Sequence, residues 1–103
     1  MGNYVFAYKG GAMAQTDAER EAAMAAWGAW FGELGAAVVD GGNPFGPAAS
    51  VASDGSVSDG ASSALSGYSV VSADSLSAAS ELARGCPVLG AGGSIEVYET
   101  LAM

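Results

Sequence analysis

The stretch from Asp17 to Leu34 constrains the fold most, because it joins a helix start signal to a single apolar stripe. Thr16 and Glu19 have the Thr-x-x-Glu spacing of a capping box, in which a hydroxyl and a carboxylate satisfy free amides at a helix start. Gly35 follows as a left-handed stop. We therefore predict a helix over 17–34, whose apolar stripe recurs at helical spacing. Its members are Ala23, Trp27, Trp30 and Leu34, flanked by Met24 and Phe31.

Four short segments predict β-strands, at 3–9, 36–40, 67–72 and 94–99. The first alternates between two sets, with Tyr4, Phe6 and Tyr8 on one face and Val5 and Ala7 on the other. Neither face of this segment is polar before its end, so we expect both sides of the sheet to be covered. The last strand places Ile95 and Val97 together on one face.

A second helix is predicted over 75–84, with Asp74 or Ser72 as its cap and Pro87 preventing its continuation. Its expected buried stripe is Leu76, Ala79 and Ala83. Between the second and third strands, residues 48–58 carry a hairpin signal, because two weakly hydrophobic arms flank the pair Asp54-Gly55. We expect an exposed arm at a sheet edge, followed by a loop over 60–66; exchange of this hairpin between subunits remains open.

The elements together predict an α+β chain of 103 residues that forms one domain. Their order, strand, helix, strand, hairpin, strand, helix, strand, is a ferredoxin-like split βαβ repeat with an antiparallel sheet and two helices on one face. Two helices leave the other face bare, and we expect that face to carry the tyrosines. A second copy stacked face to face would cover it, so we predict a homodimer that forms an α+β barrel.

Composition excludes several classes of function. Three basic residues against eleven acidic ones, a net charge of −8, cannot supply the positive stripe that nucleic acid requires. No apolar run is long enough to cross a membrane, and no secretion signal is present at the start, so we expect a cytoplasmic protein. The chain has no histidine and one cysteine, which removes most zinc sites and every histidine-based dyad. We expect no metal and no cofactor.

The chain resembles the YCII-related, or DGPF-domain, family over nearly its whole length. The motifs that carry the resemblance are Gly67-Tyr68-x-Val70, the acid-capped second helix, Cys86-Pro87, Gly92-Gly93 and Ile95-Glu96-Val97. The opening aromatic strand and the first helix add to it. The resemblance implies a dimeric α+β barrel built from ferredoxin-like protomers, which agrees with the plan above.

The resemblance implies less about chemistry. Enzyme-like members of the wider group carry a histidine on the first helix that works with an aspartate, and Trp27 occupies the matching position here. Asp59-Gly60 stands where the family writes Asp-Gly-Pro-Phe, with Ala61 and Ser62 in place of the last two residues. Of that motif's functional groups, Asp59 remains.

Five residues are candidates for a ligand cleft: Tyr8, Trp27, Asp59, Tyr68 and Glu96. Trp27 either packs in the core, as residues on an apolar helix stripe usually do, or stacks a planar ligand. Asp59 is either solvated or part of a carboxylate pair that shares a proton. Glu96 should face the dimer side, opposite Ile95, where a buried charge needs a partner. We expect its partners among the hydroxyls of Tyr4, Tyr8, Tyr68 and Tyr98.

We expect the remaining candidate residues to have structural roles. Asp40 is expected at the surface, and Cys86 is expected to be a buried thiol, since no histidine is present to activate it. The leading hypothesis is a non-catalytic dimer that binds a small molecule or a protein partner in the cleft between sheet and helix. The alternatives are an enzyme that uses Glu96 or Asp59 as its base, and a purely structural interaction partner.

Overall fold

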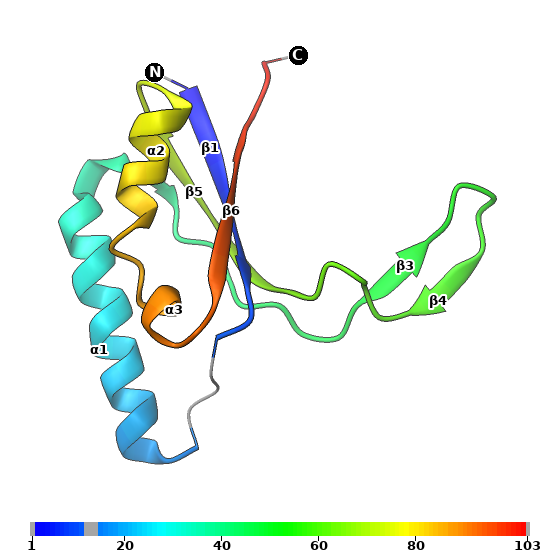
Figure 1. Ribbon diagram of the computed structural model, residues 1–103, viewed down its shortest axis with the longest axis horizontal. Coiled ribbons are helices and arrows are strands. Elements are labelled where there is room, and N and C mark those ends of the chain that lie inside the picture. Colours follow the sequence, from blue (N-terminus) through cyan, green and yellow to red (C-terminus); the bar gives the residue numbers. More distant parts are fainter. Residues whose placement is uncertain (1, 12–14, 103) are drawn as a thin grey trace.

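The computed structural model describes residues 2–11 and 15–102 (Figure 1). The strands are β1 (Gly2–Lys9), β2 (Val38–Asp40), β3 (Ala49–Val51), β4 (Val57–Asp59), β5 (Leu65–Ala73) and β6 (Ser94–Glu99). The helices are α1 (Asp17–Leu34), α2 (Leu76–Ala83) and α3 (Pro87–Gly90), and one turn of 3-10 helix, η1 (Gly35–Ala37), follows α1. Across the described ranges, we find no helix with the length and apolar character that a bilayer crossing demands.

Four strands form one antiparallel sheet in the order β2-β5-β1-β6. The two central strands, β1 and β5, are separated in the sequence by a helix, a strand and a hairpin. This order, with α1 and α2 as the two crossovers, is compatible with a ferredoxin-like fold. The predicted α+β class and the antiparallel four-stranded sheet are therefore confirmed.

The core lies between this sheet and the helices, which all cover the same face (Figure 1). Tyr4, Phe6 and Tyr8 of β1 point into this layer and are at most 5% exposed. Trp30 stacks on Phe6 with ring centroids 6.1 Å apart, and Val71 of β5 completes the centre of the core. The buried members are Tyr4, Phe6, Tyr8, Trp30, Val71, Ala73, Ala79, Ala83, Cys86 and Val88.

The expectation that the uncovered face carries the four tyrosines is wrong for two of them. Tyr4 and Tyr8 lie under the helices, because the bulkier residues of β1 fill the wide helix-sheet layer and leave Val5 and Ala7 on the other side. We call that other side the open face. Cross-strand pairing with Val5 and Ala7 places Val70, Tyr68, Tyr98 and Glu96 on it.

The open face is only partly covered within one chain. Val5, Tyr68 and Val70 are half-buried there, and Tyr98 is 55% exposed. No described helix or strand packs over it, as the placement of all helices on the opposite side shows (Figure 1). The open face thus retains an apolar surface next to a fully built core.

Helix α1 begins and ends as predicted. The Thr16 hydroxyl accepts a hydrogen bond from the Glu19 amide at 3.1 Å, and Gly35 adopts a positive φ of 54° at the end. The predicted stripe divides along the helix: Trp30 is buried, Trp27 and Leu34 are half-buried, and Ala23 is exposed. The N-terminal half of α1 therefore extends past the core.

The second helical region needs two corrections. Ser75 caps α2, rather than Asp74 or Ser72, and its hydroxyl accepts from the Ala78 amide at 3.0 Å. Leu76 does not join the buried stripe and is 48% exposed, because it is the first residue of the helix and lies beyond the end of the core. A third helix also forms, α3, in which Pro87 occupies the first turn, where its missing N–H costs nothing.

The strand boundaries differ in two places. The loop predicted over 60–66 ends early, because β5 begins at Leu65 and pairs there with Lys9 across a bulge. The strand predicted at 36–40 keeps only Val38–Asp40, since Ala36 and Ala37 continue the helical turn of η1.

The predicted hairpin forms a separate two-stranded ribbon of β3 and β4, with Val51 paired to Val57 and Ser50 to Ser58. We call residues 49–59 the arm. The arm extends away from the sheet on the side opposite the helices (Figure 1). It gives the Cα trace a radius of gyration of 15.0 Å, larger than the roughly 13 Å of a compact domain of this length. The prediction of an exposed arm is confirmed, but its placement at a sheet edge is wrong, because β3 and β4 form their own sheet and do not pair with the four-stranded one.

Candidate functional site

A cavity of about 810 Å³ opens beside the core, where the N-terminal half of α1 extends past the sheet. Trp27 and Phe31 of α1 line one side, and Tyr8 at the end of β1 lines the floor. Pro44, in the turn after β2, and Val88 of α3 also contribute to the walls. Four separate parts of the chain thus meet at one largely apolar hollow.

The cavity wall is an aromatic cluster. The Trp27 ring meets Tyr8 edge to face with centroids 5.1 Å apart, and it lies 5.9 Å from Phe31. Trp30 stands behind Trp27 and does not line the cavity; its indole N–H donates to the Leu82 carbonyl at 3.1 Å. Of the two tryptophans on the stripe, Trp30 is a core residue and Trp27 presents its ring to the cavity.

One buried polar chain runs along the floor. The Tyr8 hydroxyl donates to the Ser69 hydroxyl at 2.8 Å, which donates to the Gly41 carbonyl at 2.7 Å. Burial raises the pKa of Tyr8 to about 12, so the phenol is protonated and neutral near pH 7. Both protons are used within this chain, which fixes the Tyr8 ring against Trp27 and ties β1 to the turn at 41–44.

That turn requires glycine at position 42. Gly42 has a φ of +73°, and a Cβ built there would lie 1.7 Å from the Tyr68 carbonyl oxygen. This close approach brings the 41–44 segment against β5 and places Pro44 at the cavity. The Gly42 amide also donates a hydrogen bond to the Asp40 carboxylate at 2.8 Å, and this bond holds the turn in place.

Charge reaches this cavity at one described position. Arg20, in the second turn of α1, lines the rim, and its guanidinium contacts the Asp17 carboxylate at 3.0 Å in an exposed ion pair. No Asp or Glu is among the described residues that line the cavity. Among residues 2–11 and 15–102, no three potential metal ligands come together.

The structure brings together only part of the predicted site. Tyr8 and Trp27 are in contact in the cavity wall. Tyr68 contributes to the lining as well, although it belongs to the open face and its ring stacks on Phe45 at 5.8 Å.

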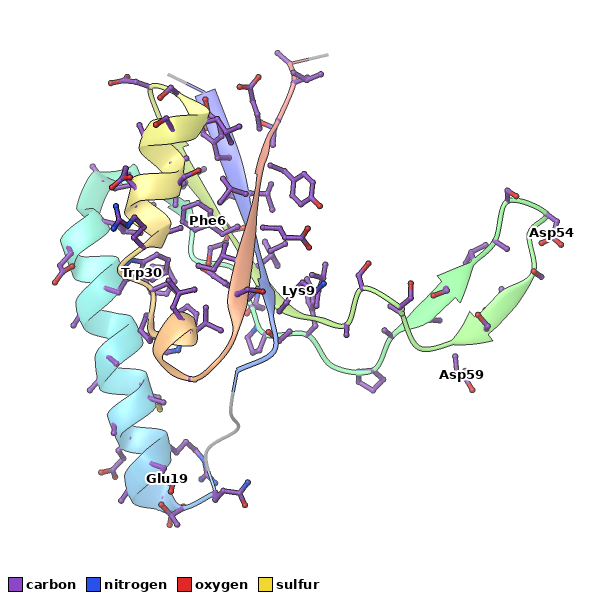
Figure 2. All side chains as sticks on the ribbon, viewed as in Figure 1. Phe6, Lys9, Glu19, Trp30, Asp54 and Asp59 are labelled. Carbon is purple, nitrogen blue, oxygen red and sulfur yellow. The ribbon has the colours of Figure 1, made fainter. Side chains whose placement is uncertain are left out.

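The two carboxylates lie elsewhere. Asp59 is at the end of β4, on the arm and far from the aromatic wall (Figure 2). Glu96 is exposed on the open face as expected, and of the four tyrosines Tyr98 is the one whose hydroxyl donates a hydrogen bond to it, at 3.4 Å. Neither side chain lines the cavity.

Two further expectations concern single residues. Asp40 is exposed, as predicted, and accepts only the hydrogen bond from the adjacent turn. Cys86 is a buried free thiol, as predicted, and burial raises its pKa to about 11. A protonated, inaccessible thiol belongs to the packing between the helices and the sheet.

Sequence reasoning missed Ser69, Phe31, Pro44 and Arg20 as cavity residues. Ser69 carried a usable signal, because it is the one polar residue at an inward position of β5, between Gly67 and Val71, and such a residue needs a hydrogen-bond partner. Pro44 carried none, since its position depends on the long-range approach of its turn to β5.

Comparisons with protein-family models, with curated proteins and with solved structures found no match to this chain. The function is therefore argued from the cavity and the two surfaces described above.

Proposed function

We propose that this chain is a small binding module that holds a planar, mainly apolar molecule in the cavity between α1 and the sheet. One observation carries the proposal: an aromatic wall, Trp27 with Phe31 and Tyr8, lines a volume of about 810 Å³. This volume is within the range of about 300–1,000 Å³ that small-molecule sites occupy.

The wall chemistry defines the ligand class. Flat aromatic side chains recognise a flat ligand by stacking and edge contacts, and their burial with it provides the affinity. The neutral Tyr8 phenol makes no demand for a charged group at the floor. Arg20 at the rim favours a ligand that carries an anionic substituent at its outer end.

The proposal assigns no reaction to the cavity. An acid-base enzyme needs a titratable group within hydrogen-bond reach of the substrate. Asp59 and Glu96, the two carboxylates that an enzymatic alternative would use, lie on the arm and on the open face. The resemblance to the YCII-related family points the same way, because Trp27 stands at the position where enzyme-like members of the wider group carry a histidine.

We further infer that the module is a homodimer whose two open faces stack. The apolar, half-covered side chains of Val5, Val70 and Tyr98 support this arrangement, since water is expelled from both faces at once. The resemblance to dimeric α+β barrel proteins supports it independently.

Binding of anilinonaphthalenesulfonate tests the cavity, because this probe joins a flat, apolar naphthalene ring to an anionic sulfonate, and its fluorescence rises in apolar surroundings. We expect saturable binding by the native chain, quenching of tryptophan emission, and a thermal shift that grows with probe concentration. Ala23→Trp places an indole at a cavity-lining position of α1 and should abolish these effects. Ala29→Trp adds the same group to the same helix at a position outside the lining and should leave them intact.

Equal probe binding by the native chain and by both variants would place the probe elsewhere, such as the open face, and would contradict the proposed site. A panel of planar carboxylates and sulfonates measured by the same thermal shift then identifies the preferred anionic group. Loss of the preference on Arg20→Gln, with binding of neutral planar probes retained, would support the role of the rim cation.

A further inference from the structure

The arm carries a pair of valines that no residue within 2–11 or 15–102 of the same chain covers. Val51 and Val57 are directly paired across the ribbon, and they are 69% and 68% exposed. Ser50 and Ser58 lie on the other face. The valine face also carries the cross-strand pair of Ala49 and Asp59, so it is apolar in its outer part and ends in a carboxylate at the base of the ribbon. Alternation of this kind is typical of a ribbon that buries one side.

The arm is nevertheless a formed structure. The Asp54 carboxylate accepts from the Ser56 amide at 2.8 Å, and Gly55 has the positive φ of 89° that the tight turn needs. Two hydrogen bonds join the strands at the root of the arm, where it meets the rest of the chain at Ala48 and Gly60. The Ser50 hydroxyl donates to the Gly60 carbonyl at 2.6 Å, and the Gly60 amide donates to the Ala48 carbonyl at 2.8 Å. An isolated two-stranded ribbon is marginal in water, so this one gains stability if a second surface covers the valines.

The arm continues the apolar surface of the open face. Phe45 precedes the arm in the sequence and is 47% exposed. Its ring stacks on Tyr68, whose ring belongs to the open face. The arm leaves the sheet on the open side, away from the helices (Figure 1). A second protein molecule that stacks on the open face therefore contacts the arm as well.

Charged side chains lie on both of these surfaces. The arm carries two carboxylates, Asp54 and Asp59, and no cation. Lys9, one of three basic residues in the chain, lies on the open side near the arm's root (Figure 2). A second copy that presents its open face brings its Lys9 toward these carboxylates, and Glu96 is the acidic side chain on that same face.

We propose that the arm is a clasp that packs Val51 and Val57 against a second copy of this chain in the dimer. The proposal rests on the inferred stacking of open faces and adds a specific contact to it. Two-fold symmetry supplies two identical clasps, so each copy both holds and is held. Because the arm is preformed, docking costs little ordering entropy.

Sedimentation equilibrium over a concentration series measures the dimer dissociation constant. Val51→Thr with Val57→Thr keeps β-branched side chains and shape but adds hydroxyls to the docking face, and we expect the constant to rise about tenfold or more. Val51→Asp with Val57→Asp should raise it further. Leu76→Asp with Leu89→Asp adds the same charge to exposed helix-side positions and should leave the constant within about twofold.

The dissociation constant of the native chain, compared with those of the variants, distinguishes a wrong clasp from a wrong dimer. A native dimer with unchanged affinity in both arm variants overturns the clasp and leaves the stacked dimer standing. A native chain that is monomeric throughout the micromolar range overturns the dimer and the clasp together, while probe binding in the cavity still tests the binding function. Replacement of residues 49–59 by Asn-Gly, bridging the bonded root from Ala48 to Gly60, should reproduce the threonine result with native far-UV circular dichroism.

Discussion

The body and the arm of this molecule use the same β-strand alternation but differ in what covers the apolar side. In β1, Phe6 is fully buried, because α1 and α2 lie over the inward face. In the arm, Val51 and Val57 form an equally regular pair and remain exposed. Alternation with a period of two thus predicts that a strand has an apolar face. It does not say whether the same chain or another molecule covers that face.

This difference separates two kinds of stability. The body gains its free energy of folding from the aromatic cluster, and each large side chain there contributes through burial and packing. The arm depends on a turn, a few hydrogen bonds and any surface that docks on it. Mutations in the body should therefore change the free energy of unfolding, whereas mutations in the arm should change association.

Trp30→Ala should have the largest effect on the body. It removes an indole that is 3% exposed and leaves a cavity beside Phe6, which costs about 3–5 kcal/mol in typical cores. Urea unfolding followed by circular dichroism measures the loss. Ala29→Gly, on the exposed face of the same helix, should cost about 1 kcal/mol. Equal losses in the two variants would show that the aromatic cluster does not dominate the core.

Gly42→Ala should be the next largest. The added Cβ meets the Tyr68 carbonyl, and the positive φ adds strain, so we expect a loss of about 2–3 kcal/mol and weaker probe binding in the cavity. Gly41→Ala is the matched control, because a Cβ at the neighbouring position has open space. A stable Gly42→Ala variant with native probe affinity would show that the turn can retreat from β5 without affecting the site.

The sequence predicts the elements of the body well, because their signals are local. The capping box at Thr16 and the glycine stop at Gly35 mark both ends of α1, and the alternation in β1 separates the correct two sets of residues. What the local pattern does not decide is which set faces the helices. That choice depends on the volume of the whole helix-sheet layer, which is why the predicted side is wrong for Tyr4 and Tyr8.

The site is less predictable, because long-range approaches create it. Tyr8 and Trp27 were both candidates, yet their contact depends on how far α1 extends past the sheet. Asp59 was a candidate through a short motif, and the arm carries it away from the cavity. Pro44 reaches the cavity because Gly42 allows a close backbone contact that composition alone does not reveal.

Alkaline pH should weaken the body through its buried titratable groups, among which Cys86 and Tyr8 have the largest pKa shifts. The pKa of Cys86 rises from 9.0 to about 11 and that of Tyr8 from 10.0 to about 12, both chiefly because burial disfavours the charged form. The folded state then binds more protons than the unfolded one above pH 9, so stability is full below pH 9 and falls as pH rises to about 12. Urea midpoints across this range measure the slope.

Two variants show which buried group causes the loss of stability in each part of the pH range. Cys86→Ala should delay the onset of the decline from about pH 9 to about pH 10, while Tyr8→Phe should flatten the upper part between about pH 10 and pH 12. Tyr98→Phe, an exposed tyrosine, is the control and should leave the profile as it is. A decline that begins at the same pH in all three variants would mean that neither buried group controls it.

Val57→Ala should have the smallest effect on the body and gives the sharpest test of the contrast with the arm. Val57 is 68% exposed and contacts no member of the core, so the free energy of unfolding of the isolated chain should change by at most about 0.5 kcal/mol. Dimerisation couples folding to concentration, so the same substitution should lower the melting temperature more at high protein concentration than at low. An equal shift at both concentrations would mean that the arm is part of the folding unit of a single chain, and the distinction between body and arm would fail.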